Sequence, residues 1–264
     1  MNLAITSDQL TTLLPTLARP PVIIDARPHA AYLSSARVIE GSIRLIPEQF
    51  TTNASLFLGA QVVVFDNDDA AASTEVVNKL RALGLQAMTV DDGFDGWSRA
   101  GGKVLPKPMG APTTWVTRAR PKVDRVACPW LILRMIDPDA KFLYVPADDV
   151  RATAAQHPAI PYDIPNVTFS HEGALCSFDA MIHKFGLSDP ALLDMAVIVR
   201  GADTAVFALA PQAAGLVAIS LGLSRLYADD HAMLAQGLVL YDALYAWCRD
   251  GRGERHDWNP AFLP

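Results

Sequence analysis

The stretch Gln61-Val-Val-Val-Phe65 is apolar after its first residue, which is typical of a strand buried on both faces of a parallel sheet. A segment with helical character, 71–83, follows and ends at Gly84, a residue type that often closes a helix. A second short apolar run, Ala87-Met-Thr-Val90, comes next, and Pro21-Val-Ile-Ile-Asp25 precedes them all. This alternation predicts an N-terminal α/β domain with a parallel sheet.

Composition limits the class of protein. The chain has 264 residues, 51% of them hydrophobic, which suits one or two domains with packed cores. A formal net charge of −6 argues against broad nucleic-acid or membrane-surface binding. Three widely spaced cysteines fit a reducing cytosol, and the N-terminus lacks the pattern of a signal peptide. We therefore expect a cytoplasmic protein, and we interpret the most apolar stretch, 205–223, as a buried helix with its preceding turn.

Two domains are predicted from a break in composition. Residues 104–113 contain three prolines and a glycine, which indicates a linker. The N-terminal domain is expected to span residues 1–107 and the C-terminal domain residues 114–264. Strand and helix signals alternate at the start of the second domain and helical signals follow from residue 176, which predicts a mixed α/β to mainly helical fold.

Polar residues follow three predicted strands of the C-terminal domain, at 114–117, 141–145 and 167–169. If these strands are parallel, their carboxyl ends share one edge of the sheet, where open α/β sheets bind ligands. The residues just past the three ends are Arg118 and Arg120, Asp148 and Asp149, and Ser170, His171 and Glu172.

Four cations lie around the start of a predicted helix at 122–135: Arg118, Arg120, Lys122 and Arg125. Because a helix N-terminus and nearby cations both favour an anion, they are candidate oxyanion ligands, or else a solvated basic surface. Asp124 and Cys128 are four residues apart and share one helix face. Cys128 is a candidate for redox or catalytic chemistry, or else a small buried apolar residue.

Candidate metal ligands occur in three further places. His171, Glu172 and Asp203, with Asp124 as a fourth, have side chains that bind transition metals, and Cys176 and His231 are additional candidates. The spacing matches no standard zinc motif, so a backbone-bonded His171, a structural His231 and a helix-capping Asp124 remain alternatives. Gly201 is expected to end a helix and to place Asp203 in the following loop. The expected cofactor is a transition metal ion.

Several N-terminal motifs resemble the rhodanese-like domains. They are Val22-Ile-Ile-Asp-Ala-Arg27, Ile39-Glu-Gly-Ser-Ile43 and Gly84-Leu-Gln-Ala-Met-Thr-Val-Asp-Asp-Gly-Phe-Asp-Gly-Trp97, and the similarity covers about residues 8–104. An active rhodanese has a cysteine at the end of the central strand, where this chain has Asp66 in the sequence Asp66-Asn67-Asp68-Asp69. A carboxylate carries no transferable sulfur, so we predict an inactive domain that serves as a scaffold or docks a partner protein. Cation binding by the acidic loop is the alternative.

The segment from Trp115 resembles the C-terminal domain of ChrB-type chromate-resistance proteins. The matching stretches include Asp124-Arg-Val-Ala-Cys-Pro-Trp-Leu-Ile132, Phe169-Ser-His-Glu-Gly173, Arg200-Gly-Ala-Asp203 and Tyr241-Asp-Ala-Leu-Tyr245. The resemblance implies a role in bacterial chromate resistance, as a sensor, a regulator or an accessory protein. Regulator members of the family carry a different N-terminal domain, so the resemblance speaks against direct DNA binding here.

Three hypotheses follow. The first is a chromate-resistance protein with a metal or chromate-like oxyanion site in the C-terminal domain. The second is a metal-dependent oxidoreductase whose link to chromate is incidental. The third is a non-catalytic protein whose two domains dock partners.

Overall fold

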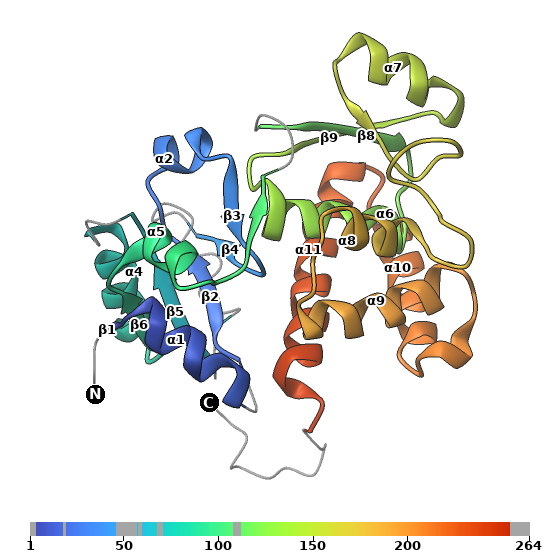
Figure 1. Ribbon diagram of the computed structural model, residues 1–264. Helices are drawn as coiled ribbons and strands as arrows, with labels where there is room; N and C mark the ends of the chain where they lie inside the picture. Colours follow the sequence, from blue (N-terminus) through green and yellow to red (C-terminus); the bar gives the residue numbers. More distant parts are fainter. Residues whose placement is uncertain are drawn as a thin grey trace. The chain divides into compact units, whose positions relative to one another are not determined.

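The computed structural model describes residues 4–17, 20–45, 57, 60–67, 71–107 and 112–253 (Figure 1). Contacts between residues divide the chain into two compact units: Met1–Lys107 together with Arg252–Pro264 (unit 1), and Pro108–Gly251 (unit 2). The predicted C-terminal domain extended to residue 264, whereas unit 2 ends at Gly251, and residues 254–264 lie outside the described part. Among the described residues, no helix combines the length and the apolar character needed to cross a membrane.

The parallel sheet that the sequence predicts for unit 1 has five strands in the order β1-β6-β5-β2-β4. Its strands are β1 (Ala4–Ile5), β2 (Val22–Asp25), β4 (Ile43–Arg44), β5 (Gln61–Phe65) and β6 (Gln86–Val90). A separate antiparallel pair joins β3 (Arg37–Ile39) to β7 (Val104–Pro106).

Helices cover both faces of this sheet. They are α1 (Ser7–Leu13), with a 3-10 turn at Leu14–Thr16, α2 (His29–Ser34), α4 (Ala71–Ala82) and α5 (Gly93–Arg99). Successive side chains of a strand point to opposite faces. Accordingly, Val62 and Val64 pack in one core cluster with Leu80 of α4, while Val63 packs in another with Trp97 of α5.

Unit 2 begins with a three-stranded parallel sheet of order β10-β8-β9. The strands are β8 (Thr114–Arg118), β9 (Lys141–Val145) and β10 (Ile160–Pro161). The predicted strand at 167–169 is wrong, because only an isolated bridge links Phe169 to Tyr162. The Phe169 ring packs against Trp115 at 5.1 Å and Phe185 at 5.2 Å, so aromatic packing accounts for the apolar character of this segment.

The rest of unit 2 is mainly helical, as predicted. Its helices are α6 (Asp124–Leu131), α7 (Val150–Gln156), α8 (Ser177–Lys184), α9 (Pro190–Asp203), α10 (Ala213–Leu226) and α11 (Asp230–Ala246), with 3-10 turns at Ala147–Asp149 and Phe207–Leu209. Turns of π-helix, Ile132–Ile136 and Trp247–Gly251, extend α6 and α11. Val150 of α7 packs against Val116 on one face of the sheet, while α6, α8, α9 and α11 contact one another (Figure 1).

Candidate metal centre

Asp124 is the buried first residue of α6, and the turn before it is strained. Val123 has a φ of 44°, which is rare for a β-branched residue. Its N–H donates to Ser220 Oγ (2.9 Å), and its carbonyl accepts from the Tyr241 hydroxyl (2.7 Å). The Asp124 carboxylate in turn accepts the N–H of Ser177, the first residue of α8, at 3.1 Å. Four elements therefore position this carboxylate.

Asp163 lies two residues beyond β10 and is also buried. Its Oδ1 accepts a hydrogen bond from Ser177 Oγ (2.9 Å), and its Oδ2 contacts Arg118 Nη2 (2.7 Å) and Arg125 Nε (3.2 Å). Thr117 of β8 donates to the Tyr162 carbonyl at 2.9 Å, which ties the preceding residue to the sheet. Asp163 is thus held at the carboxyl end of β10, beside the carboxyl end of β8.

His171 brings the acidic residues together. Its Nε2 lies 3.5 Å from Asp124 Oδ2, 3.4 Å from Asp163 Oδ1 and 3.2 Å from Asp203 Oδ2. One ligand atom from each of Asp124, Asp163 and His171 lies within 4.8 Å of the others. The His171 side chain is 44% exposed, so the cluster is open to solvent on this side.

Asp203 reaches the cluster because α9 is longer than predicted. The expected C-cap, Gly201, lies inside the helix, and Asp203 is its last residue. A Cβ on Gly201 would lie 3.1 Å from Ala213 Cβ and 3.3 Å from the Val206 carbonyl oxygen. Glycine at this position therefore serves the close approach of α9 to α10 and does not end the helix.

The crowded carboxylates change the acidity of the cluster. Burial and the Asp124 charge raise the pKa of Asp203 to about 7, and burial raises the pKa of Asp163. A hydrogen bond to Asp124, together with the three negative charges, raises the pKa of His171 to about 9. At neutral pH the cluster therefore retains protons that separate side chains would release.

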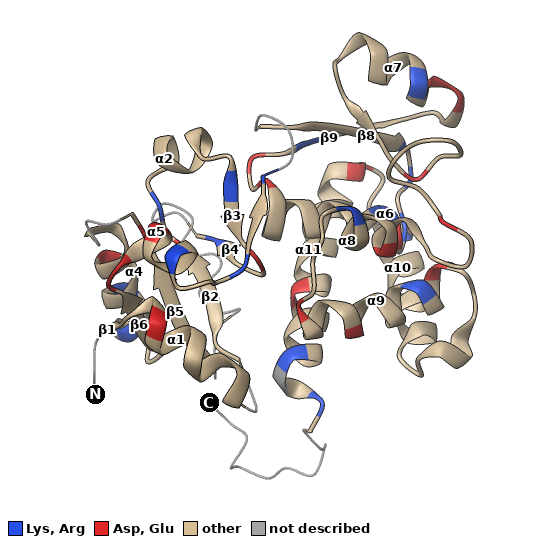
Figure 2. Cartoon of the chain, viewed as in Figure 1, with Lys and Arg blue, Asp and Glu red and all other residues tan. Residues whose placement is uncertain are grey.

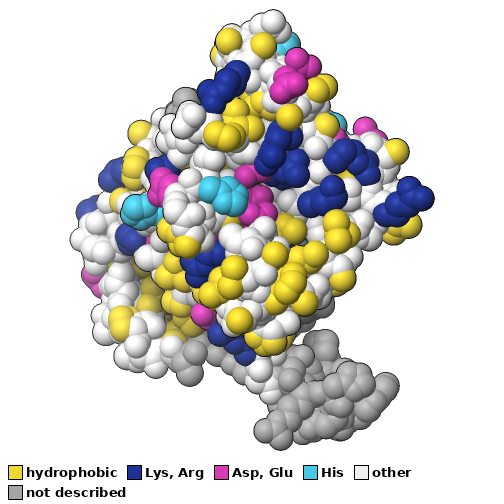
Figure 3. All heavy atoms as spheres, turned by 90° about the vertical axis from the view of Figure 1, so that its right-hand side faces the viewer, with side chains coloured by type: hydrophobic (Ala, Val, Ile, Leu, Met, Phe, Trp, Pro, Cys, Tyr) yellow, Lys and Arg dark blue, Asp and Glu magenta, His cyan; other side chains and the backbone are white. Residues whose placement is uncertain are grey.

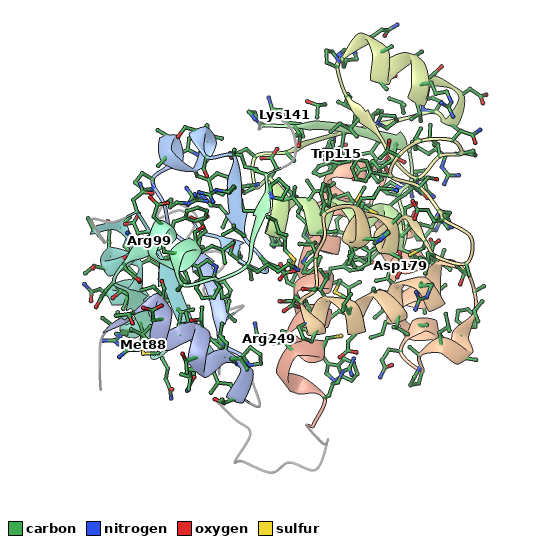
Figure 4. All side chains as sticks on the ribbon, viewed as in Figure 1. Met88, Arg99, Trp115, Lys141, Asp179 and Arg249 are labelled. Carbon is green, nitrogen blue, oxygen red and sulfur yellow. The ribbon has the colours of Figure 1, made fainter. Side chains whose placement is uncertain are left out.

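The two nearby thiols are neutral. Burial raises the pKa of Cys128 well above the usual thiol value, and Asp124 raises it further. Burial likewise raises the pKa of Cys176, whose thiol lies 3.3 Å from Asp179 Oδ2 (Asp179 is labelled in Figure 4). Because the thiolate is the nucleophile, Cys128 is not activated for the catalytic role considered from the sequence. Cys176 lies outside the group of candidate ligand atoms of Asp124, Asp163 and His171.

Two further candidates lie outside the cluster. Glu172 pairs with Lys184, which lowers the pKa of the Glu172 carboxyl. His231 packs edge-on against the Tyr144 ring at 5.4 Å. The structure therefore brings together Asp124, His171 and Asp203 from the predicted metal ligands, and it leaves out Glu172, Cys176 and His231.

The four cations at 118–125 do not form one anion site. Arg118 and Arg125 bind Asp163, whereas Arg120 donates to the carbonyls of Ser224, Tyr227 and Ala228 at the end of α10. The Lys122 side chain is half-buried and has no ion pair within the described residues. Acidic and basic residues lie close together around α6 and α8 (Figure 2). On the face of unit 2 shown in Figure 3, a His side chain lies against Asp or Glu side chains, with Lys and Arg nearby.

Asp66 of unit 1 has a local structural role. Its buried carboxylate accepts the N–H groups of Asn67 (2.7 Å), Ala72 (2.7 Å) and Ser73 (3.1 Å), and the last two belong to the first turn of α4. The side chain thus binds the free donors of a helix N-terminus. Asp68 and Asp69, the other acidic residues of this predicted loop, lie outside the described residues.

Sequence reasoning missed Asp163. The strand before it has only two residues, one of them a proline, so no apolar run marked it. The rule that ligands bind beyond the carboxyl ends of parallel strands applies to Asp163 once β10 is known. Asp148 and Asp149, which were expected at this edge, lie in the 3-10 turn before α7.

Comparison with known proteins matches both units. A family model described as the ChrB C-terminal domain matches residues 115–248, and the rhodanese-like domain model matches residues 9–100. Protein ChrB of Cupriavidus metallidurans is 36% identical over 132 residues, which are 50% of this chain and 39% of that protein. The chain therefore spans well under half of the length of this relative.

Among solved structures, a rhodanese-like domain protein from Staphylococcus aureus shows 23% identity and a TM-score of 0.32, covering 37% of this chain and 91% of that one. A protein from Lactobacillus plantarum shows 19% identity and a TM-score of 0.35, covering 39% and 88%. The assignment of the chain to a family rests on the two family models. Since one of them matches half of the sequence, the chain belongs to the family defined by the ChrB C-terminal domain, and a rhodanese-like domain precedes that domain.

Proposed function

We propose that this protein acts in bacterial chromate resistance through a divalent transition-metal site in unit 2, formed by Asp124, Asp163, His171 and Asp203. The observation that carries the proposal is the placement of three carboxylates within 3.2 to 3.5 Å of one imidazole nitrogen. Like charges this close are costly unless a proton or a cation lies among them. A metal ion would supply more positive charge than the protons it displaces.

The donor set indicates the class of metal. Carboxylates are hard ligands and imidazole is a borderline one, and a set of three carboxylates and one imidazole suits Mn²⁺ or Fe²⁺. Among the described residues, the group of candidate ligand atoms contains no thiol. Zn²⁺ remains the main competitor, since it also accepts imidazole and carboxylate ligands.

The surroundings of the site favour binding of an anion from solvent. The side chains of His171 and Arg118 are 44% and 42% exposed, so the cluster is accessible from their side. An oxyanion that entered there would meet the metal and the Arg118 guanidinium together. We assign to this site a sensing role in the cytoplasm, in which a bound metal recruits the oxyanion.

Metal titration of the full-length protein tests the proposal. After chelator treatment and dialysis, calorimetry with Mn²⁺ is expected to give one ion per chain. Asp203→Asn preserves shape but removes a ligand charge, so it should weaken binding at least about tenfold. The matched control is Glu172→Gln, on the neighbouring loop, whose carboxylate pairs with Lys184 and should leave Mn²⁺ affinity unchanged.

Two outcomes would contradict the proposal. One is the absence of binding with Mn²⁺, Fe²⁺ and Zn²⁺ alike, and the other is an equal loss of affinity in both variants. The link to chromate is tested in cells: at equal protein level, Asp203→Asn should lower chromate tolerance and Glu172→Gln should not.

A further inference from the structure

Helix α10 is less buried than its sequence predicts. The most apolar stretch of the chain, 205–223, was expected to form a buried helix with its preceding turn. The structure contains that helix, but only one face of it is buried, through Ala213, Leu216, Ser220 and Ser224. A helix with apolar residues on both faces is normally covered on both. The other face of α10 therefore lies open where its composition predicts a cover.

The open face of α10 is almost uncharged. Arg225 is its one charged residue, because α10 contains no other charged side chain. The remaining exposed residues of the helix are apolar or glycine: Ala214, Gly215, Ala218, Ile219, Leu221, Gly222 and Leu226. We call these eight residues the outer face of α10. A helix face that stays in water normally carries polar side chains.

The turn before α10 enlarges this apolar surface. Among the described residues, ten large hydrophobic side chains are exposed, and six of them lie between Val206 and Leu226. Three of the six, Val206, Phe207 and Leu209, belong to the turn that packs beside α10. The six side chains are 42–78% exposed and leave on the order of 500 Å² open, which is most of the roughly 800 Å² that each partner buries in a standard interface.

The charge of this surface indicates what covers it. A helix that lies on a membrane normally has many Lys and Arg residues on its polar side, whereas the outer face has Arg225 alone and the chain has a net charge of −6. A strongly charged protein would find few opposite charges here. A second copy of the chain presents an equally apolar and equally uncharged surface. The charge and the area therefore favour self-association.

The shape of the outer face also allows it to pack against itself. A Cβ added at Gly215 or Gly222 would meet nothing within 4 Å, so packing among the described residues does not require glycine there. If two copies of α10 pack antiparallel across a twofold axis at Ala218, Leu221 of one copy faces Gly215 of the other. The two Arg225 side chains then lie at opposite ends, about 20 Å apart along the helices, whereas a parallel pair would bring them together.

We propose that the protein is a homodimer whose interface is formed by the outer face of α10 and the turn 206–209, with the two copies of α10 antiparallel. Analytical ultracentrifugation of the full-length protein over a range of concentrations tests the association. A dimer with a dissociation constant of about 1 µM or below is expected. A protein that stays monomeric at about 100 µM overturns the proposal.

A matched pair of variants tests the location of the interface. Leu221→Glu should raise the dissociation constant at least about a hundredfold, because the twofold axis places the carboxylate in the apolar interface twice. The control is Leu83→Glu in unit 1, where the leucine is 54% exposed against 51% for Leu221. It should change the dissociation constant by less than about twofold. Because both side chains are exposed, both variants should fold, which circular dichroism checks. An equal effect of the two substitutions overturns the proposal.

Cross-linking tests the orientation of the two helices. The three native cysteines are buried, so Ala218→Cys adds an exposed thiol at the proposed axis. Oxidation with diamide should link two copies through this residue, and the control Leu83→Cys should remain unlinked. A dimer that Ala218→Cys fails to link, or a monomer that binds phosphatidylglycerol vesicles through Leu221, overturns the proposal.

Discussion

Val123 stores backbone strain next to the cluster of Asp124, Asp163, His171 and Asp203, and substitution at Val123 should reveal this strain. Val123→Ala and Val123→Gly both remove the buried side chain, but only glycine adopts a φ of 44° without a steric penalty. We therefore expect Val123→Gly to be more stable than Val123→Ala by about 1 kcal/mol, the reverse of the usual order. Urea unfolding measures both variants, and a more stable alanine variant would show that the strain is absent.

Asp66 should stabilise unit 1 through its three accepted hydrogen bonds. Asp66→Ala leaves those N–H groups without the carboxylate, so we expect a loss of about 1–3 kcal/mol in the free energy of unfolding. The control is Glu75→Ala in α4, the helix whose first turn Asp66 binds. This change removes only an exposed ion pair with Lys79 and should cost less than about 0.5 kcal/mol. Equal losses would show that the Asp66 carboxylate has no special role.

The absence of sulfur transfer at unit 1 is a separate prediction. Wild-type protein and Asp66→Ala should both fail to transfer sulfur from thiosulfate to cyanide, because neither has a thiol at this position to carry the sulfur. A cyanide assay that detects thiocyanate checks this. Clear turnover in Asp66→Ala would mean that another residue carries the sulfur and that the inactive assignment is wrong.

At the scale of single residues, the sequence was informative where residue type alone limits the chemistry. Asp124, His171 and Asp203 were chosen for their side chains, and the structure brings them together. Glu172 carries a carboxylate as an aspartate does, but this carboxylate forms an ion pair with Lys184. Side-chain direction in a turn depends on tertiary contacts, so adjacency to His171 could not decide the matter.

Arg120 is expected to stabilise helix α10 and not to bind a ligand. Its guanidinium donates to carbonyls at the end of the helix, which complements the negative end of the helix dipole. Arg120→Ala should lower the free energy of unfolding by about 1–3 kcal/mol, and Arg120→Lys should restore little because an ammonium lacks the planar fork. Mn²⁺ affinity should remain within about twofold in both variants. A large loss of affinity without a loss of stability would place Arg120 in the binding site.

Helices and strands with a long hydrophobic pattern were predicted better than short ones. The apolar runs of β5 and β9 gave the bounds Gln61–Phe65 and Lys141–Val145 directly. The two-residue strand β10 has too few side chains for any periodicity. The prediction for the end of α9 was wrong because the sequence alone does not distinguish a glycine that permits close helix packing from a glycine that caps a helix. Both errors affect residues of the candidate centre, Asp163 and Asp203.

At the scale of the whole molecule, the metal-free protein should lose stability as pH rises. The pKa of His171 is about 9 in the fold against 6.5 as a free group, so the folded state binds the extra proton between these values. Its stabilising contribution is complete below pH 6.5 and is lost as pH rises through 9. Asp203, whose pKa is raised from 3.8 to about 7, adds a second loss of stability as pH rises from 3.8 through 7.

Thermal unfolding of chelator-treated protein, compared with His171→Gln at each pH, isolates the histidine contribution. The wild-type protein should be the more stable of the two at pH 6, and this advantage should vanish above pH 9, because neutral His171 no longer offsets the three carboxylates. Mn²⁺ should reverse the trend. Because the ion must displace protons from the cluster, its stabilisation of the wild-type protein should grow with pH. A difference between the two proteins that stays constant from pH 6 to above 9, or an Mn²⁺ effect independent of pH, would mean that His171 does not share its proton with this cluster.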